Sequence, residues 1–261
     1  MPDLLIDDAD GVRTFTLNRP DAFNSFTVAL KEAFLDAVLE TAKDESVRAV
    51  VITGAGKAFC AGQDLKEHVA LLEAGDPAPL HTVERHYNPL IKAIIGMPKP
   101  VIAAVNGMAA GAGASLAFAS DLRVAAASAK FLMAFANVGL TADSGASWTL
   151  PRLIGHGRAM EMMMLAHPVN AEDALRIGMV GQVVPDGEAL STAQALARRL
   201  AAGPTTAYAK IKEALAVGTA GTLDEALDAE ARTQADAGAT ADHREAVAAF
   251  VEKRKPTFTG R

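Results

Sequence analysis

The sequence of 261 residues predicts an α/β fold whose last third is mostly helical. Over the first two thirds, short apolar runs alternate with stretches of helical periodicity, which indicates parallel strands joined by right-handed helical crossovers. From about Pro151 onward the helical pattern dominates. Half of the residues are hydrophobic, so a substantial core can form. Aromatic residues make up only 5%, which favours close packing through alanine.

The first elements follow from local patterns. Short strands are expected over 4–6 and 12–17, with a turn at 7–11 between them. Leu30, Phe34 and Val38 recur at helical spacing and predict a helix over 26–43. The next expected elements are a strand over 48–53, a helix over 64–73, a mobile loop or lid over 74–79, a helix over 83–95, a strand over 101–105, a helix over 112–119 and a strand over 122–126.

The C-terminal part contains one further strand between helices. The apolar run 180–184 predicts that strand, and Gly178 ends the helix before it. The helices are expected over 158–165, 171–177, 188–202, 204–217, 223–235 and 242–253.

Charge and composition exclude several classes of protein. The formal net charge is -6 at pH 7, which disfavours nucleic-acid binding because phosphates must be neutralised. The six histidines show no ligand spacing, so no metal is expected. Cys60 is the only cysteine, so no internal disulfide can form, and packing is a more common role for such a residue than catalysis. Without a signal-peptide pattern or a bilayer-long apolar run, we expect a soluble, cytoplasmic protein.

The most informative feature is a pair of segments rich in small residues, 58–65 and 106–114. Each follows an apolar run that is expected to be a buried strand, 49–53 and 100–105. Two strand ends that open into turns of small residues can direct two backbone N–H groups at one point. Such a pair stabilises a carbonyl oxygen as it becomes an enolate or oxyanion. Close helix–strand packing alone would explain either segment by itself.

Other catalytic motifs are absent or incomplete. The Gly111-Ala112-Gly113 turn lacks the full dinucleotide fingerprint, and no phosphate loop is present. Ser115, Ser144 and Ser147 do not lie in a nucleophile elbow.

Asp143 has two interpretations from its sequence context. An Asp before Ser-Gly is commonly a helix cap. Its neighbours, however, include Phe135, Val138 and Leu140, and a carboxyl beside an apolar surface becomes a stronger base.

Taken together, these residues resemble the crotonase superfamily, also called the enoyl-CoA hydratase/isomerase family. The similarity runs almost from end to end and is carried by 58–65, 99–107, the Gly-rich turn, 139–152 and 171–184. The resemblance implies a spiral of β-β-α turns over 1–195 that contains an acyl-CoA site. It also implies a helical oligomerisation region over 196–261, in a homotrimer or a dimer of trimers.

The resemblance also implies roles for individual residues. The N–H groups of Ala61 and Ala112 would hold the thioester oxygen. Residues expected to contact the coenzyme A or acyl part are Gly62, Asp64, Leu65, Gly111, Phe135, Leu140, Trp148 and Lys253. Lys253 has a second interpretation, as a solvated cation at a helix C-terminus. Coenzyme A would enter as part of the substrate, and no further cofactor is implied.

The branch of the family follows from the acidic positions. Hydratases carry two glutamates, whose matches here are Ser115 and Phe135. Asp143 matches the working aspartate of several relatives that are not hydratases, and the local sequence is most similar to the phenylacetate-pathway isomerase branch. We therefore expect an isomerase in which Asp143 moves a proton. The alternatives are an enoyl-CoA hydratase, a dehalogenase with Asp143 as nucleophile, and an acyl-CoA-binding homologue without activity.

Overall fold

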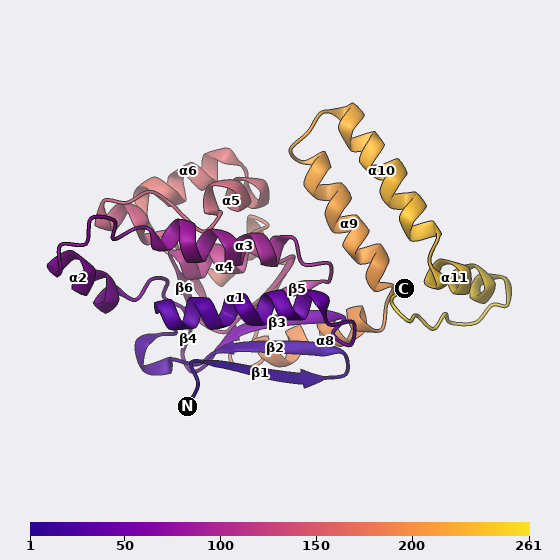
Figure 1. Ribbon diagram of the computed structural model, residues 1–261, viewed down its shortest axis with the longest axis horizontal. Coiled ribbons are helices and arrows are strands. Elements are labelled where there is room, and N and C mark those ends of the chain that lie inside the picture. The colour runs from indigo at the N-terminus through magenta and orange to yellow at the C-terminus, as the bar shows by residue number, and fades with distance from the viewer.

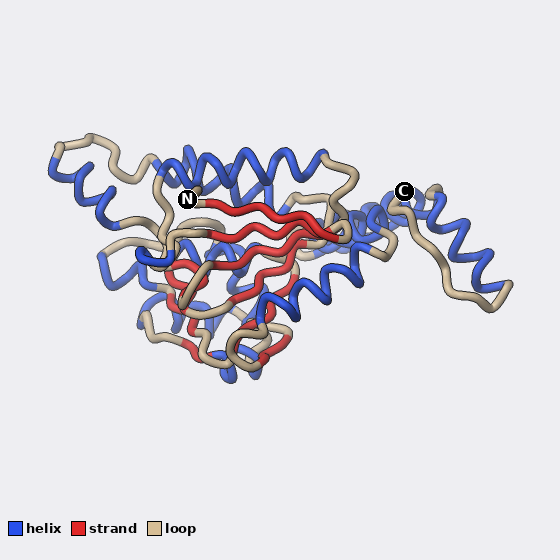
Figure 2. The backbone as a smooth tube through the Cα atoms, turned by 90° about the horizontal axis from the view of Figure 1, so that it is seen from below, coloured by secondary structure: helices blue, strands red, loops and turns tan.

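The structure is a computed structural model that describes all 261 residues. Its body is built on two sheets (Figure 1). The larger has the strand order β1-β2-β3-β5-β7-β10, and the smaller has the order β4-β6-β8-β9. Figure 2 shows the strands of the larger sheet running side by side through the body. This architecture confirms the predicted α/β class.

The larger sheet is parallel except at one edge. β1 (Leu4–Ala9) pairs antiparallel with β2 (Val12–Leu17) through a tight turn at Asp10 and Gly11, which both have positive φ. All the other pairs are parallel, as the alternating pattern predicts. The remaining strands are β3 (Ala49–Gly54), β5 (Val101–Val105), β7 (Leu122–Ala126) and β10 (Gln182–Val184).

The smaller sheet is absent from the sequence-based prediction. Its strands are β4 (Ala58–Cys60), β6 (Met108–Ala110), β8 (Lys130–Leu132) and β9 (Val169–Asn170). None exceeds three residues, too few for a period of two to appear. The β4 and β6 segments were interpreted as turns, and the structure corrects this. Both are short strands that pair in parallel before their turns begin.

The helices agree with the predicted pattern in most places. Thr27 caps α1 (Val28–Lys43) by accepting from the N–H of Leu30. The predicted helix over 83–95 is divided into a π-helical turn, Val83–Tyr87, and α3 (Asn88–Ile95). The others are α2 (Leu65–Glu73), α4 (Ala112–Ala119), α5 (Ala146–Ile154), α6 (His156–Leu165), α7 (Ala171–Arg176), α8 (Ala189–Ala201), α9 (Thr205–Gly218), α10 (Leu223–Gly238) and α11 (Ala241–Val251).

The core lies between the larger sheet and its helices. On α8 the buried residues are alanines at every fourth position, Ala189, Ala193, Ala197 and Ala201. This row lets α8 lie close against β2, β3, β5 and β7. Helix α5 was not predicted. It contains Pro151, which lacks an N–H and ordinarily indicates a break.

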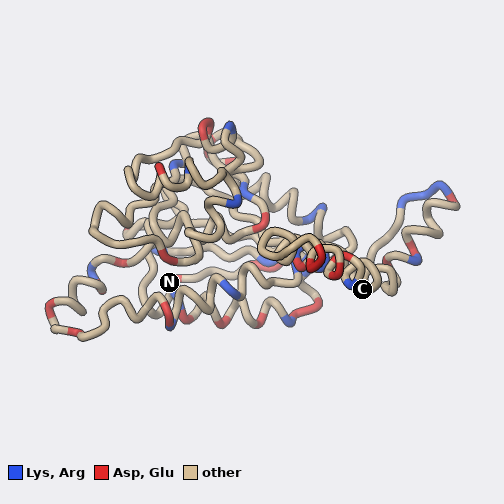
Figure 3. Tube along the Cα trace, turned by 90° about the horizontal axis from the view of Figure 1, so that it is seen from above, with Lys and Arg blue, Asp and Glu red and all other residues tan.

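The last three helices extend away from the body (Figure 1). Helices α9 and α10 pack together as an antiparallel hairpin, and α11 follows at the far end. The expected boundary between residues 195 and 196 falls inside α8, which packs on the sheet, so the extension begins at α9. Acidic and basic residues are interspersed over most of the chain (Figure 3). None of the helices combines the length and the apolar character that crossing a membrane requires.

Candidate functional site

Three strands of the smaller sheet end at the same edge, and residues of the site follow directly after them. β4, β6 and β8 are parallel neighbours, so their carboxyl ends meet there. Gln63 follows β4, Ala112 follows β6, and Phe135 follows β8. The chain then continues to Asp143, just before α5. The two small-residue segments and Phe135 therefore meet at this edge of the sheet.

Glycines allow the turn after β4 and the start of α4 to approach each other. A methyl group on Gly113 would lie 2.1 Å from the carbonyl oxygen of Cys60. Gly62 has φ of +89°, and a methyl group on it would lie 2.8 Å from the carbonyl oxygen of Ala110 and 3.2 Å from the nitrogen of Ala112. Such contacts exclude any side chain. The two small-residue segments are thus in direct contact, as their composition indicated.

The structure corrects the expected first N–H donor. The N–H of Ala61 already donates to the carbonyl oxygen of Phe23 at 3.0 Å, so it is not available to a substrate. Two residues later, the N–H of Gln63 donates to no protein acceptor. The role of Gln63 could not be predicted from the sequence, because the Ala61–Phe23 hydrogen bond joins segments far apart in the chain.

The orientation of the Gln63 N–H follows from its neighbours. The carbonyl of Gly62 accepts from the N–H of Phe26 at 2.7 Å, and the N–H of Asp64 donates to the carbonyl of Phe26 at 3.0 Å. In a trans peptide the C=O and N–H point in opposite directions. Because the Gly62 carbonyl faces Phe26, the Gln63 N–H faces away from it.

The N–H of Ala112, the expected second donor, has no acceptor in the protein. Ala112 is the first residue of α4, so its N–H has no acceptor within the helix. No side chain caps this helix. The positive end of the helix dipole adds to the attraction for a negatively charged oxygen. The N–H groups of Gln63 and Ala112 are therefore both available to a ligand at the same edge.

Asp143 lies in a turn in which its carboxylate does not cap a helix. Ser144 and Gly145 both have positive φ, and α5 begins at Ala146 without a side-chain cap. The side chain of Asp143 has one hydrogen bond, in which the Ser144 hydroxyl donates to Oδ1 at 2.9 Å. The helix-cap interpretation is therefore wrong for this residue, and Oδ2 can meet another group.

The environment of Asp143 makes it a stronger base than an ordinary carboxylate. Burial raises its pKa, while the Ser144 hydrogen bond and the positive charge of Lys31 act in the opposite direction. A raised pKa increases the proton affinity that a general base needs.

The two positions that hold glutamates in hydratases carry no acid here. Ser115 is completely buried on α4, and its hydroxyl donates to the carbonyl of Gly111 at 3.1 Å. Phe135 is half-buried, and a methyl group on Gly111 would lie 3.8 Å from its ring. Phe135 therefore forms an apolar wall beside the Gly111 turn.

Other predicted contact residues are placed differently. The Asp64 side chain is used inside the protein, because it accepts from Arg19, Ser25 and the N-terminal N–H groups of α2. Its predicted contact with coenzyme A is therefore not available to the carboxylate. Leu65 is exposed at the start of α2.

Leu140 and Trp148 are both partly exposed rather than packed in the core. Trp148 lies off the buried face of α5, where the Arg152 guanidinium stacks on its ring with 4.1 Å between the guanidinium carbon and the ring centroid. Lys253 follows α11, at the opposite end of the molecule from α2 (Figure 1). Within one chain, Lys253 is therefore not brought to this site.

Lys31 and Tyr87 also belong to the site, although neither was predicted as a site residue from the sequence. Gln63 Oε1 accepts hydrogen bonds from the Tyr87 hydroxyl at 2.6 Å and from Lys31 Nζ at 3.1 Å. Lys31 follows the helical pattern of α1 and looks like an ordinary surface lysine in the sequence. Only the tertiary structure buries it. No group of three or more His, Cys, Asp or Glu side chains is arranged to hold a metal ion.

Comparison with known proteins places this chain in one family. Residues 7–261 match the enoyl-CoA hydratase/isomerase family, and the chain belongs to it. Among its relatives, 1,2-epoxyphenylacetyl-CoA isomerase of Escherichia coli K12 is 47% identical over 96% of both chains. A probable enoyl-CoA hydratase of Rhodobacter capsulatus is 45% identical over 97% of this chain and 96% of its own. Trans-2-decenoyl-[acyl-carrier-protein] isomerase of Streptococcus mutans is 35% identical, with similar coverage.

Solved structures agree with this assignment. The crystal structure of an enoyl-CoA hydratase/isomerase homologue from Mycobacterium abscessus superposes with a TM-score of 0.95 at 42% identity, covering 99% of this chain and all of its own. The fold is thus the predicted crotonase fold, and the protein is a crotonase-family enzyme.

Proposed function

We propose that this enzyme isomerises an acyl-CoA thioester, moving a double bond from the β,γ to the α,β position or rearranging a ring-epoxide acyl-CoA. The N–H groups of Gln63 and Ala112 polarise the thioester carbonyl, and Asp143 transfers the proton. The main support for this proposal is the carboxylate of Asp143, which caps no helix and is hydrogen-bonded only to the Ser144 hydroxyl.

The double-bond reaction needs two proton transfers and no other reactant. The carboxylate of Asp143 removes a proton from C2 of the β,γ-enoyl thioester, and the electron pair moves into a dienolate with its charge on the thioester oxygen. The resulting carboxylic acid returns the proton to C4, which gives the conjugated product and restores the carboxylate. Two N–H donors that meet the developing oxyanion stabilise this intermediate.

The substrate class is proposed from the relatives and the site together. The names of the Escherichia coli and Streptococcus mutans isomerases give an acyl-CoA and an acyl-carrier-protein substrate, respectively. Both substrates are thioesters, and a thioester carbonyl is the group that two N–H donors would hold. Phe135 contributes an apolar wall for the acyl part. Coenzyme A enters with the substrate, and no separate cofactor is needed.

Enoyl-CoA hydration is the second candidate, because the Rhodobacter capsulatus relative is named a probable hydratase. Hydration needs groups that hold and deprotonate a water molecule. Ser115 cannot deprotonate water and its hydroxyl is engaged, and Phe135 has no polar group. Asp143 would be the remaining base for such a reaction.

We also propose that the enzyme works as a homotrimer or a dimer of trimers. The extension formed by α9 to α11 carries exposed apolar side chains, Ile211, Leu215, Leu227 and Phe250 among them. A second copy that covered these side chains would remove them from water. Lys253 could then reach the coenzyme A phosphates of a neighbouring subunit.

The test uses a β,γ-unsaturated acyl-CoA in deuterated water, followed by ultraviolet absorbance and mass spectrometry. We expect the conjugated product from the wild-type enzyme. Asp143→Asn should lower kcat by roughly 10²–10⁴-fold, the usual contribution of a positioned base. Addition of water to an α,β-enoyl-CoA without double-bond migration would replace the isomerase proposal with the hydratase one.

A further inference from the structure

A buried lysine contacts the side chain of Gln63, whose N–H is one of the two proposed oxyanion donors. Lys31 is on α1 and is only 1% exposed. Its ammonium group donates to Gln63 Oε1 and to the Thr82 hydroxyl, and it lies 4.8 Å from the centroid of the Tyr87 ring. No carboxylate lies within ion-pair distance of it.

The network around Lys31 converges on one side chain. Gln63 Oε1 accepts from both Lys31 and Tyr87, while the backbone on each side of Gln63 is paired with Phe26. These contacts restrain the whole residue. The N–H and the carbonyl of Gln63 itself both face away from Phe26, because the peptides on either side are trans, and this N–H is the group proposed to meet the thioester oxygen.

The charges near Lys31 set its effect on the site. Burial lowers the pKa of Lys31, and the negative charges of Glu67, Asp143, Asp64 and Glu32 oppose that shift. Thr82 connects Lys31 to the His86 ring, which lies 3.7 Å from Glu32. Burial raises the pKa of Tyr87, and the negative charge of Asp143 acts in the same direction.

A buried cation without a carboxylate partner costs stability. Lys99 is the useful contrast, because its ammonium group donates to the carbonyls of Thr41 and Asp44 at the end of α1 and so caps that helix. Lys31 caps nothing. Its contacts run to Gln63, Thr82 and Tyr87, and Gln63 carries the proposed oxyanion donor, which points to a role in the reaction rather than in folding.

We propose that Lys31 is a positioning residue, whose ammonium group holds the Gln63 side chain so that the Gln63 N–H stays aimed at the thioester oxygen. This inference rests on the proposed function. It adds a fixed positive charge to an oxyanion site otherwise built from backbone groups.

The kinetic test compares Lys31→Met with Lys31→Arg and with Lys99→Met. We expect Lys31→Met to lower kcat by about tenfold or more, less than the loss of an oxyanion donor itself, with little change in KM. Losing the cation removes a group that stabilises the Asp143 carboxylate, so the acidic limb of the kcat/KM profile should move to higher pH. Lys31→Arg should restore part of both. Lys99→Met should lower the unfolding midpoint and leave kcat and the pH profile unchanged.

A second test does not depend on turnover. Phenylacetyl-CoA labelled with ¹³C at the thioester carbonyl is bound, and the carbonyl stretch is recorded by isotope-edited infrared spectroscopy. In the wild-type enzyme the stretch should fall below its value for the free thioester. In Lys31→Met it should return toward the free value, with Thr82→Val and Tyr87→Phe in between.

The outcomes separate the two proposals. If turnover is absent but the carbonyl shift depends on Lys31, the isomerase proposal fails and the role of Lys31 stands. If Lys31→Met keeps the wild-type carbonyl frequency and pH profile, Lys31 is only a structural residue and the inference is overturned. A wild-type stretch that does not fall on addition of the thioester would overturn both.

Discussion

The N–H of Ala61 donates to the carbonyl oxygen of Phe23 at 3.0 Å, and this one hydrogen bond determines which amide remains for a substrate. It ties the turn after β4 to the segment before α1. With Ala61 engaged and the Gln63 N–H without an acceptor, the available donor lies two residues further along the chain.

Replacing single backbone amides by esters should separate these roles. Lactic acid in place of Ala112 removes one N–H and should lower kcat by roughly 10²–10³-fold, as the loss of an oxyanion donor does. The same change at Ala61 should cost about 1 kcal/mol of unfolding free energy, the typical net value of a hydrogen bond, and spare kcat. The two variants carry the same chemical change, so each controls for the other. A large loss of kcat at Ala61 would restore it as the donor.

The raised pKa of Asp143 predicts that this residue favours the folded state more at low pH than at neutral pH. Between the unfolded value near 3.8 and the higher folded value, the folded state binds more protons than the unfolded state. The contribution of Asp143 to stability is therefore lost as the pH rises through that window. Asp143→Asn should raise the unfolding free energy near neutral pH, and this gain should vanish below pH 3.8. Urea titrations of both proteins at several pH values would measure it, and a loss of stability at neutral pH would contradict the prediction.

The contact between Gly113 and Cys60 predicts a severe effect of a single methyl group. In Gly113→Ala the new carbon would lie 2.1 Å from the Cys60 carbonyl oxygen, so α4 must move and carry the Ala112 N–H with it. We expect a loss of roughly 1–3 kcal/mol, as for other overpacked sites, together with a fall in kcat. Gly157→Ala is the matched control, because a methyl group there meets no atom within 4 Å. It should leave kcat unchanged.

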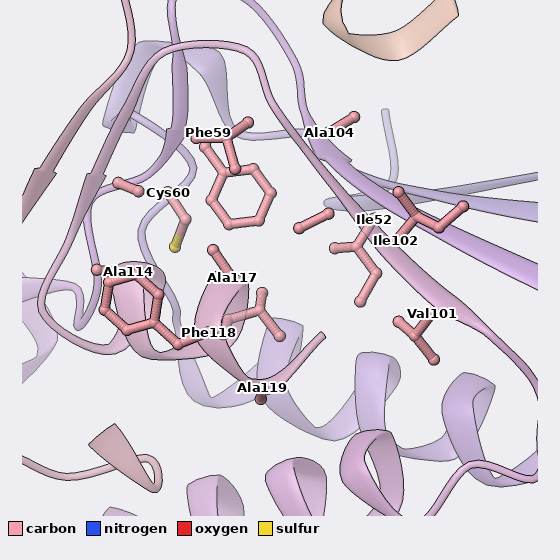
Figure 4. Packing of buried hydrophobic residues seen from close by; sticks show 14 of the residues in the cluster. Ile52, Phe59, Cys60, Val101, Ile102, Ala104, Ala114, Ala117, Phe118 and Ala119 are labelled. Atoms are coloured by element: carbon pink, nitrogen blue, oxygen red, sulfur yellow. The ribbon is translucent and has the colours of Figure 1, made fainter. Parts of the chain in front are cut away.

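The only thiol should be inert in the folded protein. Figure 4 shows the Cys60 side chain in the core beside Phe59 and Ala114, and its sulfur donates to the carbonyl of Asn24 at 3.1 Å. Burial raises the pKa of Cys60 to about 12, so almost no thiolate exists near neutral pH. Ellman's reagent should react with it only at the rate of unfolding and rapidly in denaturant. Fast labelling of the native enzyme, with loss of activity, would contradict the packing role.

Local patterns were sufficient for the larger sheet and most helices. The continuous apolar runs that form β3 and β5 identify strands buried on both faces, and the spacing of Leu30, Phe34 and Val38 identifies α1. The smaller sheet was not predicted, because its strands have at most three residues. Their pairing depends on neighbours from distant parts of the chain.

The sequence by itself determined the family, the α/β class, the two small-residue segments and Asp143 as the acid of interest, because these depend on residue type and spacing. The tertiary structure decided that Gln63 rather than Ala61 keeps a free N–H, that Asp143 caps no helix, and that Lys31 is buried beside Gln63. Whether a polar group is free or engaged depends on the partners that folding brings to it. Those partners, Phe23 for Ala61 and Lys31 for Gln63, lie more than thirty residues away in the chain.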